Sequence, residues 1–157
     1  FTQALGREEI AVLNDADAAG VAEVAFGEPQ AREGAVIFLT LGTGIGSALF
    51  IDGTLFPNTE LGHLLLDGKE AEHLASSAAK DREDLSYKKW AKRVDSVLHE
   101  YARLLNPATF IVGGGISRKA EKWVPLLTVD IPVIPAKLRN RAGIVGAAMA
   151  AHTHLAP

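Results

Sequence analysis

A glycine-rich turn between two apolar runs constrains this chain more than any other stretch. The apolar runs cover residues 35–39 and 48–51, and the turn between them carries Gly42, Gly44 and Gly46. Apolar runs bounded by glycine predict two strands joined by a tight turn. Glycine lets the backbone approach a ligand closely, and Thr43 adds a hydroxyl, so the turn could point several N–H groups at an anion. The alternative is a hairpin whose glycines serve packing alone.

The spacing of these glycines separates the turn from two common nucleotide-binding loops. A dinucleotide-binding loop has the spacing Gly-x-Gly-x-x-Gly and opens a helix, whereas this turn reads Gly-x-Gly-x-Gly and leads into a strand. A Walker loop needs Gly-Lys followed by Ser or Thr, and the turn contains no lysine. If the turn holds phosphate, it does so from a β-hairpin.

Composition excludes several classes of protein. The 157 residues are 48% hydrophobic and 22% charged, which fits one globular domain with its own core. The net charge of −3 gives no overall basic field for nucleic acid, and no apolar run approaches the roughly 18 residues of a membrane span. The chain has no cysteine, which excludes disulfides, thiolate metal sites and a cysteine nucleophile. We expect a cytoplasmic protein without nucleic-acid or membrane partners.

Hydrophobic periodicity and turn residues predict an α/β fold with a mixed sheet. The expected strands cover residues 9–13, 35–41, 47–51, 54–56, 109–112 and 131–135. The expected helices cover residues 15–26, 70–80, a stretch capped by Asp84 or Ser86 and ending near 105, one from a Ser117 cap to about 127, and 143–151. From residue 35 the order is β-β-β-α-β-α-β-α, so antiparallel strands come first and parallel crossover units follow.

Three polar segments accompany the predicted strand ends. Asp15 follows the first strand and begins a helix, where its carboxylate could accept a proton from a hydroxyl nucleophile. The alternative is that Asn14, Asp15 and Asp17 only cap that helix. Gly113, Gly114 and Gly115 follow a buried strand and precede Ser117, which suits an anion or nucleotide site.

Glu60, His63 and Glu72 form the third segment. Two carboxylates and one imidazole on loops suit either a metal ion or a polyhydroxyl ligand. One histidine without cysteine is a thin ligand set for zinc, so a sugar is favoured. The alternatives are a buried, hydrogen-bonded histidine and an exposed helix face for Glu72.

Together these segments resemble the sugar-kinase family called ROK (repressor, open reading frame, kinase), whose fold is the actin-like ATPase (ribonuclease H-like) fold. The resemblance covers about residues 9–150. It rests on four motifs in family order, namely residues 14–17, 41–46, 60–63 and 111–115, with Glu72 after them.

The resemblance implies a role for each matched residue. Asp15 would be the general base on the sugar 6-hydroxyl. The sugar hydroxyls would be held by Asn14, Asn58, Glu60, His63 and Glu72. The donor phosphates would lie on Gly42, Thr43 and Gly44, and the donor groove would be lined by Gly113, Gly114 and Gly115. Mg²⁺ would accompany the donor.

Within the family, residues 57–63 look most like the polyphosphate glucokinases. That branch implies transfer from polyphosphate or ATP to glucose. Mannose as a further substrate and assembly into a homodimer are alternatives that the sequence leaves open. Typical ROK kinases hold a structural zinc through a histidine and a cysteine cluster. Because this chain has no cysteine, we expect no such zinc and no metal ligand.

The family's first phosphate motif, an Asp-Gly-Gly-Thr-like turn, is missing before residue 10. We therefore expect residues 1–157 to be one C-terminal lobe of a two-lobe kinase, inactive alone. Residues 1–27 would be the strand–helix junction to the other lobe, and the helix in 141–153 would pack back on it. Two rival readings stay open: a sugar-sensing ROK regulator, and a strictly ATP-dependent kinase for another hexose.

Overall fold

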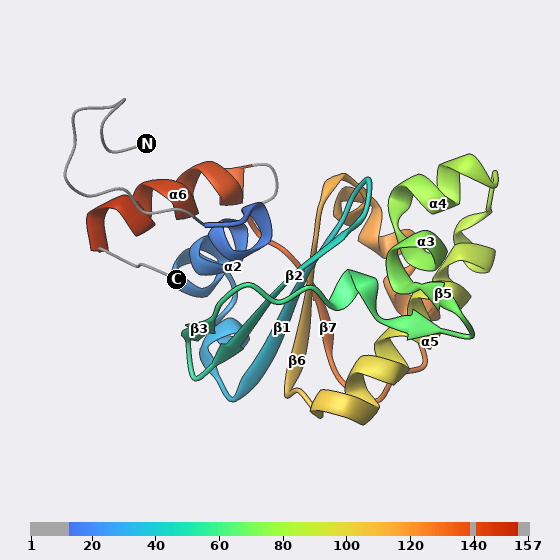
Figure 1. Cartoon of the computed structure of the whole chain (residues 1–157), viewed down its shortest axis with the longest axis horizontal. Coiled ribbons are helices and arrows are strands. Elements are labelled where there is room, and N and C mark those ends of the chain that lie inside the picture. The colour runs from blue at the N-terminus through green and yellow to red at the C-terminus, as the bar shows by residue number, and fades with distance from the viewer. Residues whose placement is uncertain (1–12, 139–140, 154–157) are drawn as a thin grey trace.

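The chain folds as a five-stranded sheet with helices on both faces (Figure 1). The structure, a computed structural model, describes residues 13–138 and 141–153. The expected strand at 9–13 lies outside the described residues except for Leu13, which is not in a strand. Within the described part, no helix combines the length and hydropathy that crossing a lipid bilayer requires.

The sheet is mixed, as predicted. Its strands in spatial order are β3 (Thr54–Phe56), β2 (Ile45–Ile51), β1 (Ala35–Leu41), β6 (Thr109–Gly113) and β7 (Val133–Pro135). β1 pairs antiparallel with β2 and parallel with β6, and β7 extends the parallel half. The proline-containing β7 lies at the edge, because proline cannot donate a hydrogen bond within a sheet.

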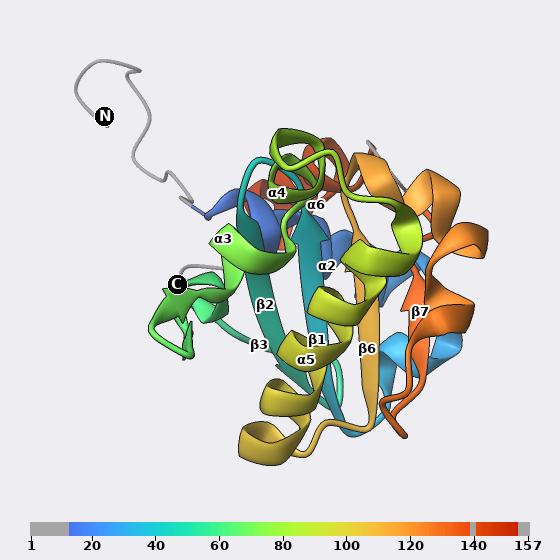
Figure 2. The ribbon, with the colours of Figure 1, turned by 90° about the vertical axis from the view of Figure 1, so that its right-hand side faces the viewer.

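Helices cover the two faces of the sheet separately. The α-helices are α2 (Asp15–Phe26), α3 (Ala71–Ala75), α4 (Ser77–Arg82), α5 (Tyr87–Leu105) and α6 (Ala142–Thr153). In Figure 2, α5 lies in front of the sheet and α2 and α6 lie behind it. Short 3₁₀ helices are η1 (Pro29–Arg32), η2 (Leu61–His63), η3 (Gly115–Lys122) and η4 (Val124–Leu126), and a separate small hairpin joins β4 (Leu65–Leu66) to β5 (Lys69–Glu70).

Side chains of β1 alternate between two hydrophobic cores. Val36 and Phe38 pack with the α2 and α6 side, whereas Ile37, Leu39 and Leu41 pack with α5. A strand covered on both faces is apolar at nearly every position, and Thr40 is the one polar residue of β1. The central strand is therefore held rigidly from both sides.

Two predicted helices differ from the structure. The helix expected over 70–80 is broken at Ser76, whose backbone is extended (φ −63°, ψ 160°) and whose hydroxyl accepts a hydrogen bond from Ala79 N. Ser76 therefore caps a second helix. Ser117 does not cap the expected helix to 127, because its hydroxyl donates to Gly114 O and the segment forms 3₁₀ turns. By contrast, Ser86 caps α5 by accepting from Lys89 N, as predicted.

The helices α2 and α6 approach each other backbone to backbone. A Cβ atom added at Gly146 would overlap the carbonyl oxygen of Ala18, so the contact requires glycine at this position. The predicted small-residue helix near the C-terminus is thus confirmed, and the structure shows that it packs on α2.

We predict that Gly146→Ala lowers the free energy of unfolding by roughly 1–3 kcal/mol or more, because the new methyl group meets backbone that cannot move aside. Gly143→Ala in the same helix is the control, since nothing lies within 4 Å of a Cβ there. Urea unfolding of both variants measures the difference. Equal midpoints for the two variants would contradict the close contact.

Candidate functional site

The two glycine loops lie side by side at one edge of the sheet. β1 and β6 are parallel neighbours with Thr40 opposite Gly113, so the loops that follow them leave the sheet at the same level. Gly114 has a φ of 85°, and a Cβ there would lie 2.6 Å from Leu41 O. Glycine at 114 is therefore required both by the left-handed backbone and by the close approach of the two strands.

The first glycine loop is hydrogen-bonded to the beginning of α4. Gly42 N–H donates to Gly44 O at 3.0 Å, while Gly42 O accepts from Ala78 N at 3.1 Å and from the Ser77 hydroxyl at 2.9 Å. These bonds fix the turn on the first residues of α4. The N–H of Gly42 is taken up inside the turn, and Thr43 is exposed at its tip. A phosphate at this turn would therefore meet the Thr43 hydroxyl rather than the Gly42 N–H.

In the second loop, the three glycines differ in surroundings. Gly113 is buried at the end of β6, where an added Cβ would lie 3.1 Å from the Phe38 ring. Its small size serves packing. Gly115 is exposed, and a Cβ there would meet nothing within 4 Å. In this loop, Gly115 is therefore accessible to a ligand, whereas Gly113 is not.

The beginning of α2 comes to the same region. The Asn14 side chain accepts a hydrogen bond from Asp17 N at 2.6 Å and so caps the helix. Asp15, the first helical residue, is exposed. Ala16 lies against the hairpin, because a Cβ on Gly46 would be 3.1 Å from the Ala16 methyl group. Asn14 therefore caps α2, which is the alternative that the sequence left open for it. Asp15 instead lies at the surface, next to the residue that contacts the hairpin.

The segment from Asn58 to His63 is tied to three other elements. Asp17 Oδ2 accepts from Asn58 N at 2.9 Å, the Ser47 hydroxyl accepts from Leu61 N at 3.0 Å, and the Tyr101 hydroxyl donates to Leu61 O at 2.7 Å. Burial, and secondarily the Glu72 carboxylate, raises the pKa of Tyr101, so its phenol stays protonated and keeps donating. Irregular in sequence, the segment is nevertheless held at defined points.

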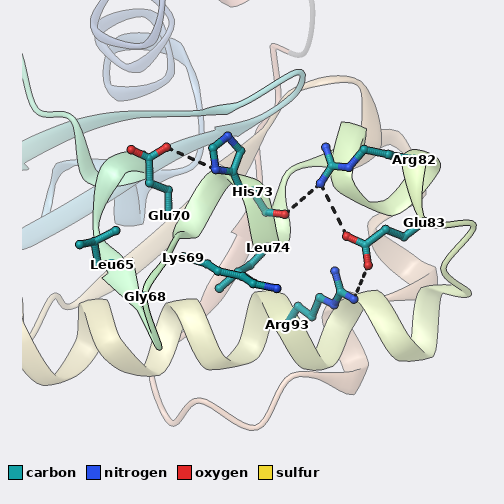
Figure 3. Close-up of a pocket in the computed structure, with 9 residues that line it drawn as sticks. All are labelled: Leu65, Gly68, Lys69, Glu70, His73, Leu74, Arg82, Glu83 and Arg93. Atoms are coloured by element: carbon teal, nitrogen blue, oxygen red, sulfur yellow. Dashed lines mark hydrogen bonds and ion pairs between the residues drawn. The ribbon is translucent and has the colours of Figure 1, made fainter.

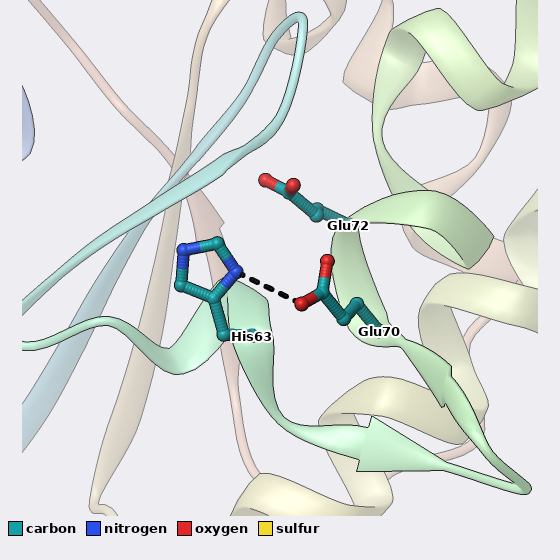
Figure 4. Close-up of side chains that lie close together, drawn as sticks. All are labelled: His63, Glu70 and Glu72. Carbon is teal, nitrogen blue, oxygen red and sulfur yellow. Dashed lines mark ion pairs between the residues drawn. The ribbon is translucent and has the colours of Figure 1, made fainter.

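His63, Glu70 and Glu72 gather around one space (Figure 4). His63 Nδ1 lies 3.4 Å from Glu70 Oε1, and its Nε2 lies 4.0 Å from Glu60 Oε2. Glu72 Oε2 lies 3.4 Å from Ile45 N, and a Cβ on the neighbouring Gly44 would overlap that oxygen. The Glu72 carboxylate therefore lies between the glycine loop and the imidazole of His63.

This cluster contains the groups that could hold a cation. One atom each from His63, Glu70 and Glu72 lies within 4.8 Å of the others, which offers one nitrogen and two oxygen ligands. His73 adds a second imidazole, with Nδ1 3.4 Å from Glu70 Oε2. The same donors and acceptors suit hydroxyl groups of a sugar, since carboxylates and imidazoles form strong hydrogen bonds with hydroxyls.

A cavity of about 550 Å³ lies beside this cluster and not at the glycine loops (Figure 3). Its wall includes Glu70 and His73, and Glu83 links Arg82 and Arg93 on its far side. The Arg93 guanidinium hydrogen-bonds Glu83 and holds the pKa of that carboxyl below its usual range. The two arginines are thus engaged by a carboxylate, and the sequence-predicted site residues are not part of this wall.

Several residues at the site were not singled out from the sequence. Ser47 and Tyr101 are buried and bind the backbone of the 58–63 segment, and Glu70 bridges His63 and His73. The one available signal for Ser47 is a hydroxyl within an apolar strand. Tyr101 lies on the apolar face of α5, where its hydroxyl gives no separate signal in the sequence.

Known proteins resemble this chain in sequence and in structure. Polyphosphate glucokinase of Mycobacterium tuberculosis (strain H37Rv) is 57% identical over 146 residues, covering 93% of this chain and 55% of the relative. The chain thus spans about half the length of the curated relatives it matches. The crystal structure of inorganic polyphosphate/ATP-glucomannokinase from Arthrobacter sp. strain KM superposes with a TM-score of 0.90 at 47% identity, covering 98% of this chain and 60% of the other.

A more distant match concerns the fold alone. A ROK family glucokinase from Streptomyces griseus, solved in complex with glucose and AMPPNP, superposes with a TM-score of 0.76 at 24% identity over 97% of this chain and 70% of the other. The expected actin-like ATPase fold is confirmed by these structures. The family model for ROK proteins matches residues 2–81, about half of the 157 residues, and the chain therefore belongs to the ROK family.

Proposed function

We propose that this chain forms the sugar-holding and phosphate-holding part of a glucokinase that transfers a phosphoryl group from polyphosphate or ATP to the 6-hydroxyl of glucose. The observation that carries the proposal is the position of Glu72, whose carboxylate lies between the glycine loop and His63. A group that suits sugar hydroxyls thereby adjoins a loop that suits phosphate. The 57% identity to a polyphosphate glucokinase supports the same substrates.

On the acceptor side, each side chain has a distinct task. Glu60, His63 and Glu72 would hydrogen-bond the sugar hydroxyls and orient the ring, with Asn14 and Asn58 beside them. Asp15 would accept the proton of the 6-hydroxyl as that oxygen attacks the terminal phosphorus. The bond from this phosphorus to the rest of the donor would break at the same time and release ADP or a polyphosphate chain shorter by one phosphate. Positioning of this kind supplies much of the rate in phosphoryl transfer, since little covalent chemistry falls to the protein.

On the donor side, the glycine loops would line the path of the phosphate chain. Thr43 and Gly115 are the exposed members of these loops, whereas Gly44 lies against the Glu72 carboxylate. These loops offer N–H and hydroxyl groups rather than carboxylates, so Mg²⁺ would come bound to the donor phosphates and neutralise their charge. Polyphosphate, ATP, mannose as a second sugar, the C-terminal-lobe assignment and a homodimer all stay predictions.

A donor comparison tests the proposed function. The full-length protein is incubated with glucose and polyphosphate, with glucose and ATP, and with glucose alone, and glucose 6-phosphate is measured. We expect product with polyphosphate and none without donor. Product with ATP alone would favour the strictly ATP-dependent reading. No product with either donor, together with glucose binding, would favour a sugar-sensing regulator and overturn the kinase assignment.

We predict that Asp15→Asn lowers kcat by roughly 10²–10⁴-fold, the usual contribution of a general base, because the amide cannot accept the hydroxyl proton. Asp52→Asn is a matched control, since Asp52 is also exposed but lies at the opposite end of β2, where it accepts from Gly34 N. Steady-state assays with glucose measure both variants. Turnover near that of the wild type in Asp15→Asn would remove Asp15 from the base role.

We predict that the purified protein carries no stoichiometric zinc. Structural zinc sites are closed and rich in cysteine, whereas this chain has no cysteine and its His63–Glu70–Glu72 cluster offers mainly oxygen ligands beside an exposed imidazole. Elemental analysis after dialysis without chelator measures the metal content. One zinc per chain, lost in His63→Ala, would contradict the prediction.

A further inference from the structure

Asp17 has an unusual position for a carboxylate. Its side chain is fully buried, with 0% of the residue exposed, on the first turn of α2. Oδ2 accepts a hydrogen bond from Asn58 N at 2.9 Å. Among the residues that the structure describes, no donor reaches Oδ1, although buried polar atoms are almost always paired. A carboxylate kept in such surroundings calls for a reason other than helix capping, which Asn14 already provides.

The hydrogen bond that Asp17 accepts holds Asn58, a residue with a left-handed backbone. Asn58 has a φ of 61°, in the left-handed region that costs most residues free energy, although asparagine tolerates it. Two residues later comes Glu60, which is exposed and lies 4.0 Å from the imidazole of His63. The far end of the segment is held by Ser47 and Tyr101 through Leu61. Asp17 therefore holds the near end.

The surroundings of Asp17 disfavour its ionised form. Burial is the largest influence and raises the pKa of Asp17, the Asn58 N–H opposes this, and the nearby Glu60 carboxylate raises it further. The geometry alone, a buried oxygen bonded to the backbone of Asn58, already links α2 to the segment that carries Glu60.

We propose that Asp17 is a positioning residue for the acceptor sugar: it holds Asn58 and, through it, Glu60 where they meet the sugar hydroxyls. This inference rests on the proposed function, and it gives Asp17 a role in sugar binding in addition to the helix capping that the sequence suggests. Asp17 does not touch the sugar itself in this scheme. Its effect should therefore fall on sugar affinity and leave the phosphate donor almost unaffected.

A matched control lies on the same helix. Glu23, 2% exposed, is the second buried carboxylate of α2, and it accepts hydrogen bonds from Lys137 N at 3.0 Å and from Leu138 N at 2.6 Å. Like Asp17, it holds the backbone of a distant segment, but that segment carries no proposed sugar ligand. Glu23→Ala therefore reports the cost of losing a buried carboxylate anchor in α2 without touching the sugar side.

The test compares Asp17→Ala, Asp17→Asn and Glu23→Ala in the full-length protein. We expect Asp17→Ala to raise the glucose KM roughly 10- to 100-fold, the range for a lost hydrogen bond to a charged or buried group, while the donor KM changes less than about twofold. Asp17→Asn keeps an acceptor oxygen for Asn58 N and should restore most of the sugar affinity. Glu23→Ala should lower the melting temperature and leave the glucose KM unchanged.

A second measurement does not depend on turnover. Hydrogen exchange at the amides of residues 58–61 should be faster in Asp17→Ala than in the wild type, and unchanged in Glu23→Ala. The inference is overturned if Asp17→Ala leaves this exchange rate or the glucose KM at the level of Glu23→Ala, or if the donor KM rises equally. Failure of the wild type to phosphorylate glucose would instead refute the proposed function, and the exchange experiment would still decide whether Asp17 holds the segment.

Discussion

The parallel pairing of β1 with β6 is the interaction on which the rest of the structure depends. It joins segments separated by nearly 70 residues and sets Thr40 opposite Gly113, so that both glycine loops leave the sheet together. A slip of one residue would turn the side chains of β1 to the wrong core, since alternate positions face opposite layers. Hydrophobic burial on both faces therefore fixes the register that brings the loops into one site.

Buried polar groups then convert this rigid sheet into a defined surface. Ser47, Tyr101 and Asp17 reach from a strand and two helices to the backbone of one irregular segment. The side chain in each of these bonds is buried, so losing its partner leaves a buried polar group unpaired and costs more than an exposed bond would. The exposed side chains of the segment, Glu60 and His63, are therefore carried on a backbone that buried anchors hold in place.

Much of this arrangement follows from local sequence, and the remainder does not. The apolar run of β1, the glycine turn and the Ser86 cap were predictable, because strand burial and capping depend on neighbouring residues. The break at Ser76 was not predicted, because a serine inside an alanine-rich stretch leaves the hydrophobic periodicity unchanged. The helix predicted to begin at Ser117 was wrong, because the Ser117 hydroxyl donates to Gly114 O and does not cap a helix. The contact of Asp17 with Asn58, 41 residues away, depends on tertiary packing that periodicity cannot reveal.

The backbone contact between α2 and α6 has a mechanical consequence. Where side chains separate two helices, a small displacement of one is absorbed by rotamer changes, but at Gly146 and Ala18 there is no side-chain layer to yield. The relative position of the two helices is therefore fixed at this contact. Ala18 directly follows Asp17 in the first turn of α2, so the packing of α6 helps to set the position of the turn that carries Asn14, Asp15 and Asp17.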